Sequence, residues 1–381
     1  MKVVIAIDSF KESLTSLEAG NAAREGILRV FPDAEVKVCP LADGGEGTTE
    51  ALVSGMGGEM VSVIVEDPLG KPVEAKYGIL SENGQKTAII EMAASSGLAL
   101  VPVELRDPMN TSTYGVGQMI ANAIGKGCRR FLVGIGGSAT NDGGAGMLQA
   151  LGFSLTDELG KPIERGAKGL KNLASVSDEC ALRKLQDCVF HVACDVNNPL
   201  CGERGASAVF GTQKGATRET IPLMDGWLKR FAELSKAVSP DADAEFPGTG
   251  AAGGLGFAFK TFLHAELRSG VSIVLEETHL KDEMEGADFV VTGEGRLDGQ
   301  TAMGKAPIGV AKLGKECGAK VLAFSGCVTK DARLCNEHGI DAFFPILRTV
   351  CTLEEAMNAE NAKENLADMA EQAFRLVKAM R

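Results

Sequence analysis

Hydrophobic and polar positions along the chain alternate between short apolar runs and longer segments with helical periodicity. The apolar run from Val3 to Ile7 predicts a buried strand, and residues 14–31 predict a helix, with Thr15 and Glu18 at the spacing of a capping box. A second strand is predicted at 36–41. A strand, a helix and a strand joined by short connections indicate a parallel sheet with helices on both faces.

The same order of elements returns twice further along the chain. A predicted helix at 116–124 precedes a strand at 130–135, and a glycine-rich loop then leads into a helix at 144–151. The C-terminal part predicts, in order, a strand at 289–292, a helix at 307–317 that opens on a proline, strands at 320–324 and 342–346, and a last helix at about 353–380.

Between these blocks the pattern changes. Residues 60–91 hold alternating runs separated by turn signals at 67–70 and 82–84, which predict antiparallel strands. Residues 152–286 mix one strand at 189–194 with long helical patterns. We therefore predict an α/β protein with two domains that are discontinuous in sequence. The first is a doubly wound parallel sheet formed by residues 1–48, 107–150 and 287–381, and the second is an α/β domain formed by residues 49–106 and 151–286.

Composition and charge narrow the class of protein. The chain has 381 residues and a net charge of −12, which argues against a nucleic-acid partner because phosphates attract a basic face. Its ten cysteines contain no close C-x-x-C pair, so reduced thiols are expected instead of disulfides or a zinc site. The N-terminus carries no export signal, and the longest uncharged stretch is too polar for a membrane span. A cytoplasmic enzyme without a membrane partner is the expectation.

Glycine is unusually frequent, and it gathers with carboxylate and hydroxyl residues just after predicted strands. The 47 glycines exceed the roughly 27 that average usage would give a chain of this length. Open α/β sheets bind ligands at the carboxyl ends of their strands, so these segments are candidate ligand loops. They are Asp8 to Lys11, Ala42 to Thr48, Gly134 to Gly144 and Thr292 to Asp298. A fifth segment, His191 to Leu200, ends an apolar strand on Asp195, although an Asp/Asn-rich stretch before proline is also typical of a simple turn.

Known phosphate-binding fingerprints do not fit these loops. Residues 299–305 satisfy G-x-x-x-x-G-K, but Ala306 stands where a P-loop needs the hydroxyl that ligates magnesium. No G-x-G-x-x-G follows the first strand, which weakens a Rossmann dehydrogenase. Lysines beside the glycine loops remain candidates for contacts with anions: Lys11, Lys214 and Lys305.

Taken together, six segments resemble the type-1 glycerate kinase family, in the same order and over essentially the whole chain. They are VVIAIDSFKESL, PLADGGEGTTEAL, GIGGSATNDGGAGMLQALG, VACDVNNPLCGERGAS, FGTQKGA and VTGEGRLDGQT with GKAPIGVA. The resemblance implies two α/β domains, one flavodoxin-like and one similar to the restriction-endonuclease core. It also implies ATP, Mg²⁺ and D-glycerate as ligands, with 2-phosphoglycerate favoured over 3-phosphoglycerate as the product.

Phosphoryl transfer needs positioning, neutralisation of charge, a metal ligand and a base for the attacking hydroxyl. For the base we predict Asp195, with Asp142 as the second candidate, and for neutralisation of phosphate or of the glycerate carboxylate Lys11 and Lys305. The predicted phosphate cradle is Gly136, Gly137, Ser138, Thr140 and Asn141 with Gly293 and Gly295. The predicted sugar-acid site is Asp8, Ser9, Asp43 and Gly44, and the predicted magnesium ligands are Glu294 and Asp298.

Two other functions stay open on the sequence. An NAD(P)-linked oxidoreductase of hydroxy acids would use the glycine loops for a dinucleotide, although its fingerprint is missing. A non-catalytic sensor of sugar acids would bind glycerate without chemistry, which leaves the several carboxylate loops unexplained.

Overall fold

The N-terminal strand, β1 (Lys2–Ile7), lies near the centre of a five-stranded sheet in the order β13-β12-β11-β1-β2. Every neighbouring pair in this sheet is parallel. The other strands are β2 (Glu35–Val38), β11 (Phe289–Leu297), β12 (Lys320–Val328) and β13 (Ala342–Pro345). Numbered along the chain, the order is 2-1-3-4-5, so the winding reverses between β1 and β11. Ligands of doubly wound sheets bind at such a reversal.

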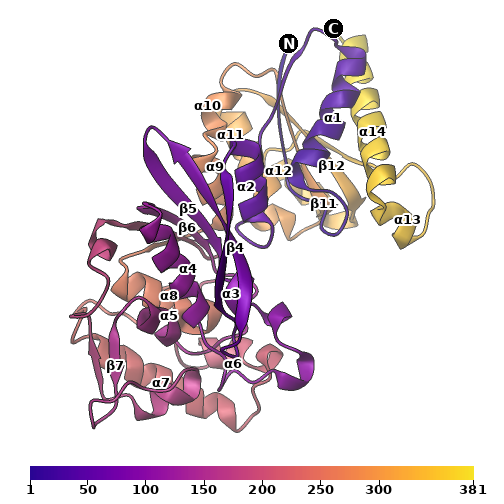
Figure 1. Ribbon diagram of the computed structural model, residues 1–381. Helices are drawn as coiled ribbons and strands as arrows, with labels where there is room; N and C mark the ends of the chain where they lie inside the picture. The colour runs from indigo at the N-terminus through magenta and orange to yellow at the C-terminus, as the bar shows by residue number, and fades with distance from the viewer. The chain divides into compact units, whose positions relative to one another are not determined.

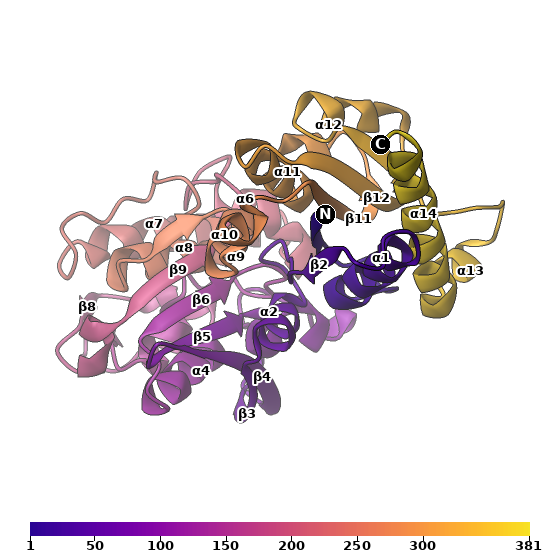
Figure 2. The ribbon, with the colours of Figure 1, turned by 90° about the horizontal axis from the view of Figure 1, so that it is seen from above.

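Helices cover both faces of this sheet. Helix α1 (Ser16–Val30) and the last helix, α14 (Ala359–Ala379), lie side by side on one face, and α11 (Ala306–Glu316) packs against β11 and β12 on the other (Figures 1 and 2). The shorter helices of this part are α10 (Leu280–Met284), α12 (Leu334–Glu337) and α13 (Leu353–Met357). None of the helices in the chain is both long and apolar enough to cross a membrane.

Local sequence explains why these elements form where they do. The side chains from Val3 to Ile7 are all fully buried, as expected for a strand covered on both faces. The predicted capping box at the start of α1 is confirmed: the Glu18 N–H donates to the Thr15 hydroxyl at 3.2 Å, and the Thr15 N–H donates to the Glu18 carboxylate at 3.0 Å. Pro307 lies in the first turn of α11, where its missing N–H costs no helical hydrogen bond.

The second sheet is mixed and has six strands, in the order β10-β9-β6-β5-β4-β3. The antiparallel meander predicted at 60–91 is confirmed as β3 (Glu59–Glu66), β4 (Pro72–Glu82) and β5 (Gln85–Glu91). Parallel pairing continues from β5 through β6 (Arg130–Gly134) and β9 (Val189–Ala193) to β10 (Glu266–Arg268). The rings of Phe131 and Phe190, which face each other on β6 and β9, stack with centroids 4.6 Å apart in its core.

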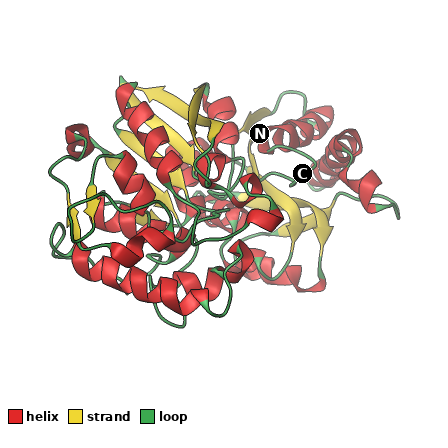
Figure 3. Ribbon diagram, turned by 60° about the horizontal axis from the view of Figure 1, so that its bottom comes forward, coloured by secondary structure: helices red, strands yellow, loops and turns green.

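Helices and a small hairpin complete this part of the chain, and Figure 3 shows the helices in red and the strands in yellow. They are α3 (Ala93–Ser96), α4 (Tyr114–Gly125), α5 (Ala145–Ala150), α6 (Ala206–Phe210), α7 (Thr220–Ser235) and α8 (Ala251–Phe262), with the hairpin of β7 (Ser154–Thr156) and β8 (Ser175–Ser177).

The structure, a computed structural model that describes residues 1–381, divides into two units. Unit 1 comprises residues 1–43, 54–56 and 271–381, and unit 2 comprises residues 44–53 and 57–270. The chain passes between the units after Asp43, within and at the end of α2 (Thr48–Met56), and at the start of α9 (Gly270–Glu277).

This division differs from the predicted domains in one large segment. Residues 107–150 belong to unit 2, because β6 pairs with β5 and β9 of the mixed sheet instead of joining β1. A buried parallel strand has the same apolar pattern in either sheet, so the pattern alone could not choose its partner. Residues 271–286, predicted in the second domain, belong to unit 1.

Candidate functional site

Unit 1 contains a cavity of about 690 Å³ at the carboxyl edge of its sheet. β1 and β11 are neighbours, with Ile7 paired to Gly293, so Asp8 and Glu294 follow at the same edge. This is the point where the strand order reverses. The predicted site residues that line the cavity are Asp8, Ser9, Lys11, Asp43, Glu294, Gly295, Asp298 and Lys305. The structure therefore brings together in one pocket three segments that the sequence suggested separately.

Two carboxylates inside this cavity are held in unfavourable surroundings. Asp8 is only 8% exposed, and burial together with the nearby charges of Asp43 and Glu294 raises its pKa to about 7. The Ser9 N–H donates to Asp8 Oδ1 at 2.7 Å and partly offsets this effect. Burial also raises the pKa of Glu294, although the Thr301 hydroxyl donates to its Oε1 at 2.5 Å. Crowded, desolvated carboxylates of this kind are stabilised by a cation.

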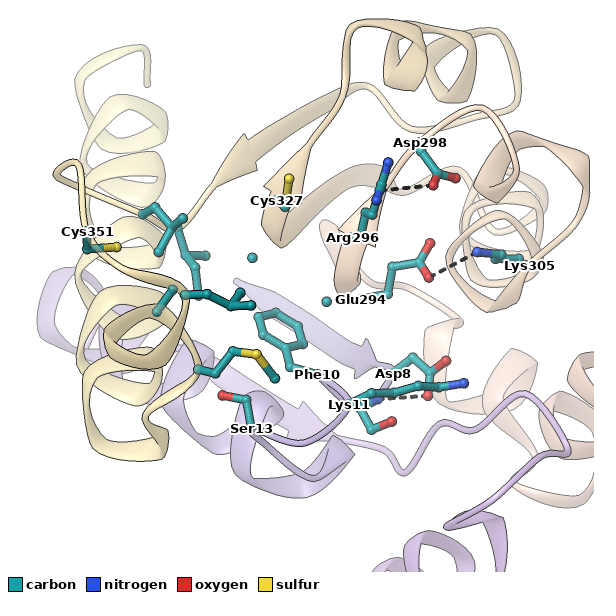
Figure 4. A pocket seen from close by; sticks show the side chains of 18 of the residues that line it. Asp8, Phe10, Lys11, Ser13, Glu294, Arg296, Asp298, Lys305, Cys327 and Cys351 are labelled. Carbon is teal, nitrogen blue, oxygen red and sulfur yellow. Dashed lines mark hydrogen bonds and ion pairs between the residues drawn. The ribbon is translucent and has the colours of Figure 1, made fainter. Parts of the chain in front are cut away.

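Two lysines provide part of that positive charge (Figure 4). Lys305 Nζ lies 4.0 Å from Glu294 Oε2, and Lys11 Nζ lies 3.8 Å from Asp43 Oδ2. Both lysine side chains are substantially exposed, so these pairs contribute little to stability and the ammonium groups can turn toward a ligand. The polar end of the cavity therefore presents both signs of charge, as a site for a metal-bound phosphate requires.

Asp298, the second predicted magnesium ligand, has other partners. Its Oδ1 accepts hydrogen bonds from the N–H groups of Gln300 at 2.9 Å and Thr301 at 3.2 Å, and its Oδ2 lies 3.3 Å from Arg296 Nε. Asp298 therefore stabilises the turn after β11. Among the carboxylates of the cavity, Asp8 and Glu294 are better placed to give oxygen ligands to a cation.

The two glycines predicted to cradle phosphate on β11 differ in their surroundings. Both lie inside the strand, which extends to Leu297 instead of ending at residue 292. A Cβ on Gly293 would lie 2.0 Å from the Phe324 carbonyl oxygen, so this glycine is required for the close approach of β12. Gly295 lines the cavity, where its lack of a side chain leaves room for a ligand. The role of either glycine in phosphate binding stays a prediction.

In unit 2 the predicted phosphate loop follows β6. Gly136 and Gly137 are exposed and Ser138 is half-buried, so these three residues are accessible to a ligand. Thr140 and Asn141 are fully buried, and the Asn141 amide donates to the Ser207 hydroxyl at 2.8 Å. The loop thus has an accessible first half and a buried second half, and only the first half can contact a phosphate in this conformation.

Asp142, the second candidate for the base, anchors the buried half of this loop. It is fully buried, and it accepts hydrogen bonds from Thr113 N–H at 2.9 Å, Gly144 N–H at 3.1 Å and Gly146 N–H at 3.2 Å. Burial raises its pKa, and these donors oppose the rise. Its surroundings favour a structural role, whereas a base must reach the hydroxyl that it deprotonates.

Lys214 lies beside the same loop and is completely enclosed. Its ammonium donates to the Thr140 carbonyl at 2.6 Å, and burial lowers its pKa to about 7, against the opposing attraction of Asp142. The sequence suggested this lysine only as one of three candidate anion contacts. Its burial and its hydrogen bond to Thr140 indicate that it stabilises the conformation of this loop.

Unfolding measured against pH tests the state of Lys214. The lysine is protonated below pH 7 in both states, and between pH 7 and about 10.5 only the unfolded chain holds the proton. Its contribution therefore makes the protein more stable as pH rises through this window, by up to about 1.4 kcal/mol per pH unit. A Lys214→Met variant should lose this slope in urea titrations at pH 7.5 and 9, and Lys168→Met, at a half-exposed lysine, should keep it. An unchanged slope in Lys214→Met would contradict the assignment.

A tight backbone turn supports the loop from the other side. Three consecutive residues at the start of α8, Ala252, Gly253 and Gly254, have φ of 52°, 68° and 90°. The Gly253 carbonyl accepts from the Gly143 N–H at 2.9 Å, and a Cβ on Gly253 would lie 2.0 Å from the Thr140 carbonyl oxygen. This turn therefore fixes the loop through backbone contacts.

Substitutions in this turn are expected to act in opposite directions. Gly253→Ala should destabilise the protein by about 3 kcal/mol or more, because the new methyl group collides with the loop backbone and φ is left-handed. Ala252→Gly, one residue earlier, should stabilise it by about 1 kcal/mol, because it relieves the left-handed strain of alanine. Thermal unfolding of both variants checks the pair. Equal melting temperatures for the two would show that the turn does not constrain the loop.

The first-choice base, Asp195, lies at the end of β9 and is exposed. Its Oδ1 accepts from the Gly270 N–H at 3.2 Å, which orients the carboxylate. Gly44, predicted to line the sugar-acid site, is buried beside this segment with φ of 85°, and a Cβ there would lie 2.6 Å from the Gly270 Cα. Gly44 therefore allows close backbone packing around Asp195.

Sequence reasoning missed Glu91, the last residue of β5. Its carboxylate accepts from Thr49 N–H at 2.7 Å and Gly47 N–H at 3.2 Å, at the start of α2. This capping fixes the glycine-rich segment that holds Gly44. A carboxylate at the end of a predicted strand was the available signal, but nothing in the sequence linked it to a helix 42 residues earlier.

Comparison with known proteins identifies the family. The profile of the glycerate kinase family matches residues 3–378. The chain belongs to the glycerate kinase family. A glycerate kinase of Halalkalibacterium halodurans is 48% identical over 370 residues, covering 96% of this chain and 97% of that protein. A glycerate 2-kinase of Escherichia coli is 46% identical over 373 residues, covering 96% of this chain and 97% of that protein.

A solved structure supports the same relationship. The crystal structure assigned to glycerate kinase 2 of Salmonella typhimurium LT2 matches with a TM-score of 0.92 and 47% identity, covering 100% of this chain and 98% of that one. The predicted membership of the glycerate kinase family, the enzyme class of phosphotransferase and the α/β fold are confirmed. A kinase uses ATP as its phosphoryl donor. Because the similar proteins are kinases, the two alternative functions, a hydroxy-acid oxidoreductase and a non-catalytic sensor, have no support.

Proposed function

We propose that the protein transfers the γ-phosphoryl group of ATP to the 2-hydroxyl of D-glycerate, giving 2-phosphoglycerate and ADP. The observation that carries this proposal is the cavity of unit 1, in which Asp8, Glu294, Lys11 and Lys305 surround one space at the reversal of the strand order. Several similar proteins are named glycerate kinases, and the one from E. coli is named glycerate 2-kinase, which favours the 2-hydroxyl. The strand order of unit 1 also supports its proposed description as flavodoxin-like.

The charged end of the cavity fits a magnesium ion that arrives with the nucleotide. No group of three or more His, Cys, Asp or Glu side chains in the chain could hold a metal alone. Magnesium usually takes one or two carboxylates and completes its shell with water and phosphate oxygens. The desolvated oxygens of Asp8 and Glu294 suit it, because a cation would remove the penalty that raises their pKa values. When bound, magnesium neutralises charge on the phosphates.

The chain's own residues supply the other functions. Lys11 and Lys305 are proposed to bind phosphate oxygens or the glycerate carboxylate. The accessible half of the loop after β6, from Gly136 to Ser138, is proposed to donate backbone N–H groups to phosphate. Thr140 and Asn141 are buried, so they are proposed to contribute to phosphate binding indirectly, by holding this loop in place.

Asp195 is the proposed base, because it is exposed and oriented at the end of a strand. It would take the proton of the 2-hydroxyl as the hydroxyl oxygen forms a bond to the γ-phosphorus. The bond from that phosphorus to the oxygen bridging the β-phosphate breaks, and ADP leaves with its electron pair. Asp8, Ser9 and Asp43, which line the unit 1 cavity, are proposed as polar contacts of the sugar acid.

A ³¹P NMR time course with ATP, Mg²⁺ and D-glycerate tests the proposal, with controls that omit each component. A new phosphomonoester signal should appear together with ADP, and its proton coupling should show a single C–H neighbour, as expected for phosphate on C2. Coupling to a CH₂ group would identify 3-phosphoglycerate instead. Intact ATP after prolonged incubation would contradict the proposed reaction.

A further inference from the structure

The unit 1 cavity has a second, apolar end that the proposed reaction does not use. Figure 4 shows the charged groups gathered on one side, with Phe10 between them and Cys351 on the far side. The apolar wall comes from the loop after β1, from the segment after β13 and from α13. It consists of Phe10, Ile346, Leu347, Leu353, Ala356 and Met357.

Neither glycerate nor a phosphate chain needs such a wall. Both are polar along their whole length and gain nothing from contact with leucine, methionine or phenylalanine. Leu353 nevertheless lines the cavity while 76% exposed, and Val350, which precedes it in the chain, is fully exposed. Large exposed apolar side chains at the mouth of a cavity mark a surface that a ligand covers.

The segment from Leu347 to Cys351 also has a free backbone edge. None of its N–H or C=O groups makes a hydrogen bond within the protein, whereas Ile346 N–H still bonds to the Ser325 carbonyl. The side chain of Arg348 holds the segment to α14 through Asn365, Asp368 and Glu364. An anchored segment with unpaired backbone groups offers N–H donors and C=O acceptors close together, which is the pattern that complements the edge of adenine.

We propose that the apolar end of this cavity binds the adenine and ribose of ATP, with the base against Phe10, Ala356 and Met357 and its edge on the backbone near Leu347. The triphosphate would then extend to Lys11, Lys305 and the carboxylates at the charged end. This inference rests on the proposed use of ATP, and it assigns the nucleoside to unit 1. A flat aromatic ring beside an apolar wall and a charged tail beside lysines match the two ends of the cavity.

The first test fills the proposed base site. Ala356→Trp places a large ring against the wall, and Glu354→Trp puts the same ring on the same helix at an exposed position outside the cavity. By isothermal titration calorimetry with Mg²⁺, ADP should bind Ala356→Trp about 30-fold more weakly or worse, since the buried ring surface is lost. Pyrophosphate should bind both variants like the wild type. The proposal would be overturned if the two variants bound ADP equally well. It would also be overturned if Ala356→Trp bound pyrophosphate as weakly as it bound ADP, relative to the wild type.

The second test needs no substitution. Cys351 lines the apolar end and Cys180, in unit 2, is an exposed internal control. ADP should slow alkylation of Cys351 by iodoacetamide, read by peptide mass spectrometry, while pyrophosphate leaves it unchanged and Cys180 reacts equally throughout. Bound ADP that leaves Cys351 fully reactive would overturn the nucleoside site. If ADP protects Cys351 but no glycerate is phosphorylated, the proposed reaction fails and this site stands.

Discussion

An Asp8→Asn variant is expected to unfold at a higher temperature than the wild type at pH 8 while its kcat falls by about 10²- to 10³-fold. The carboxylate is buried near Asp43 and Glu294, so the folded protein keeps it charged at a cost that the neutral amide avoids. Asparagine retains an oxygen for the Ser9 N–H, but it cannot offer a negative charge to magnesium or phosphate-bound cations.

The sign of the pH dependence makes this prediction specific. The pKa of Asp8 is raised from 3.8 to about 7, so the folded state holds the proton more tightly than the unfolded state does. The stability that this proton binding contributes is complete below about pH 4 and is lost as pH rises to 7. The variant should therefore match the wild type near pH 4 and exceed it by about 2 to 4 kcal/mol above pH 7. Urea titrations at both pH values measure the difference. Asp33→Asn, at an exposed turn of the same unit, should change neither stability nor kcat.

Replacing Asp195 by asparagine is expected to reduce kcat by about 10²- to 10⁴-fold, the usual contribution of a general base, with little change in stability or in the KM for ATP. The exposed side chain has the Gly270 N–H as a partner, and asparagine can accept that hydrogen bond through its own oxygen. Steady-state kinetics and thermal unfolding, measured on the same preparation, separate the chemical effect from a folding defect.

Asp142→Asn provides the contrast. In the wild type both carboxylate oxygens of Asp142 accept hydrogen bonds from backbone N–H groups. In the variant, whichever way the asparagine amide is turned, its NH₂ group faces one of these N–H donors. We expect it to lose about 2 kcal/mol or more of stability. If Asp142→Asn folded as stably as the wild type and lost more kcat than Asp195→Asn, the two proposed roles would have to be exchanged.

The edge of the sheet that carries the unit 1 cavity could be predicted from the sequence. Each candidate segment directly follows an apolar run, and parallel strands place such segments at one edge, which is how Asp8 and Glu294 meet. How deeply each residue is buried could not be predicted. Thr140 and Asn141 have the same polar character as Ser138, and the packing of Lys214, Ser207 and α8 against the loop buries them.

The apolar wall was missed because of one helix boundary. A single helix was predicted from about 353 to 380, but Asn358 ends α13 and caps α14, with its side-chain oxygen accepting from Glu360 and Asn361 N–H at 3.1 Å. Asparagine with an acidic residue in the turn that follows is a signal for a helix start, and it was available in the sequence as Asn358 and Glu360. The break sets α13 apart, and α13 carries three of the residues that line the cavity.

During synthesis, the strand β1 of the five-stranded sheet leaves the ribosome long before its neighbour β11. β1 lies between β2 and β11, so it lacks one neighbour until residue 297 has been made. At roughly 5 to 20 residues per second, about 15 to 60 seconds separate the synthesis of these two strands. During that time unit 2 can fold, whereas β1, in which every residue from Val3 to Ile7 is apolar, is left with one unpaired edge. Nascent chains of this protein are therefore expected to depend on a chaperone that covers their first 40 residues, and chains truncated before β11 are expected to aggregate.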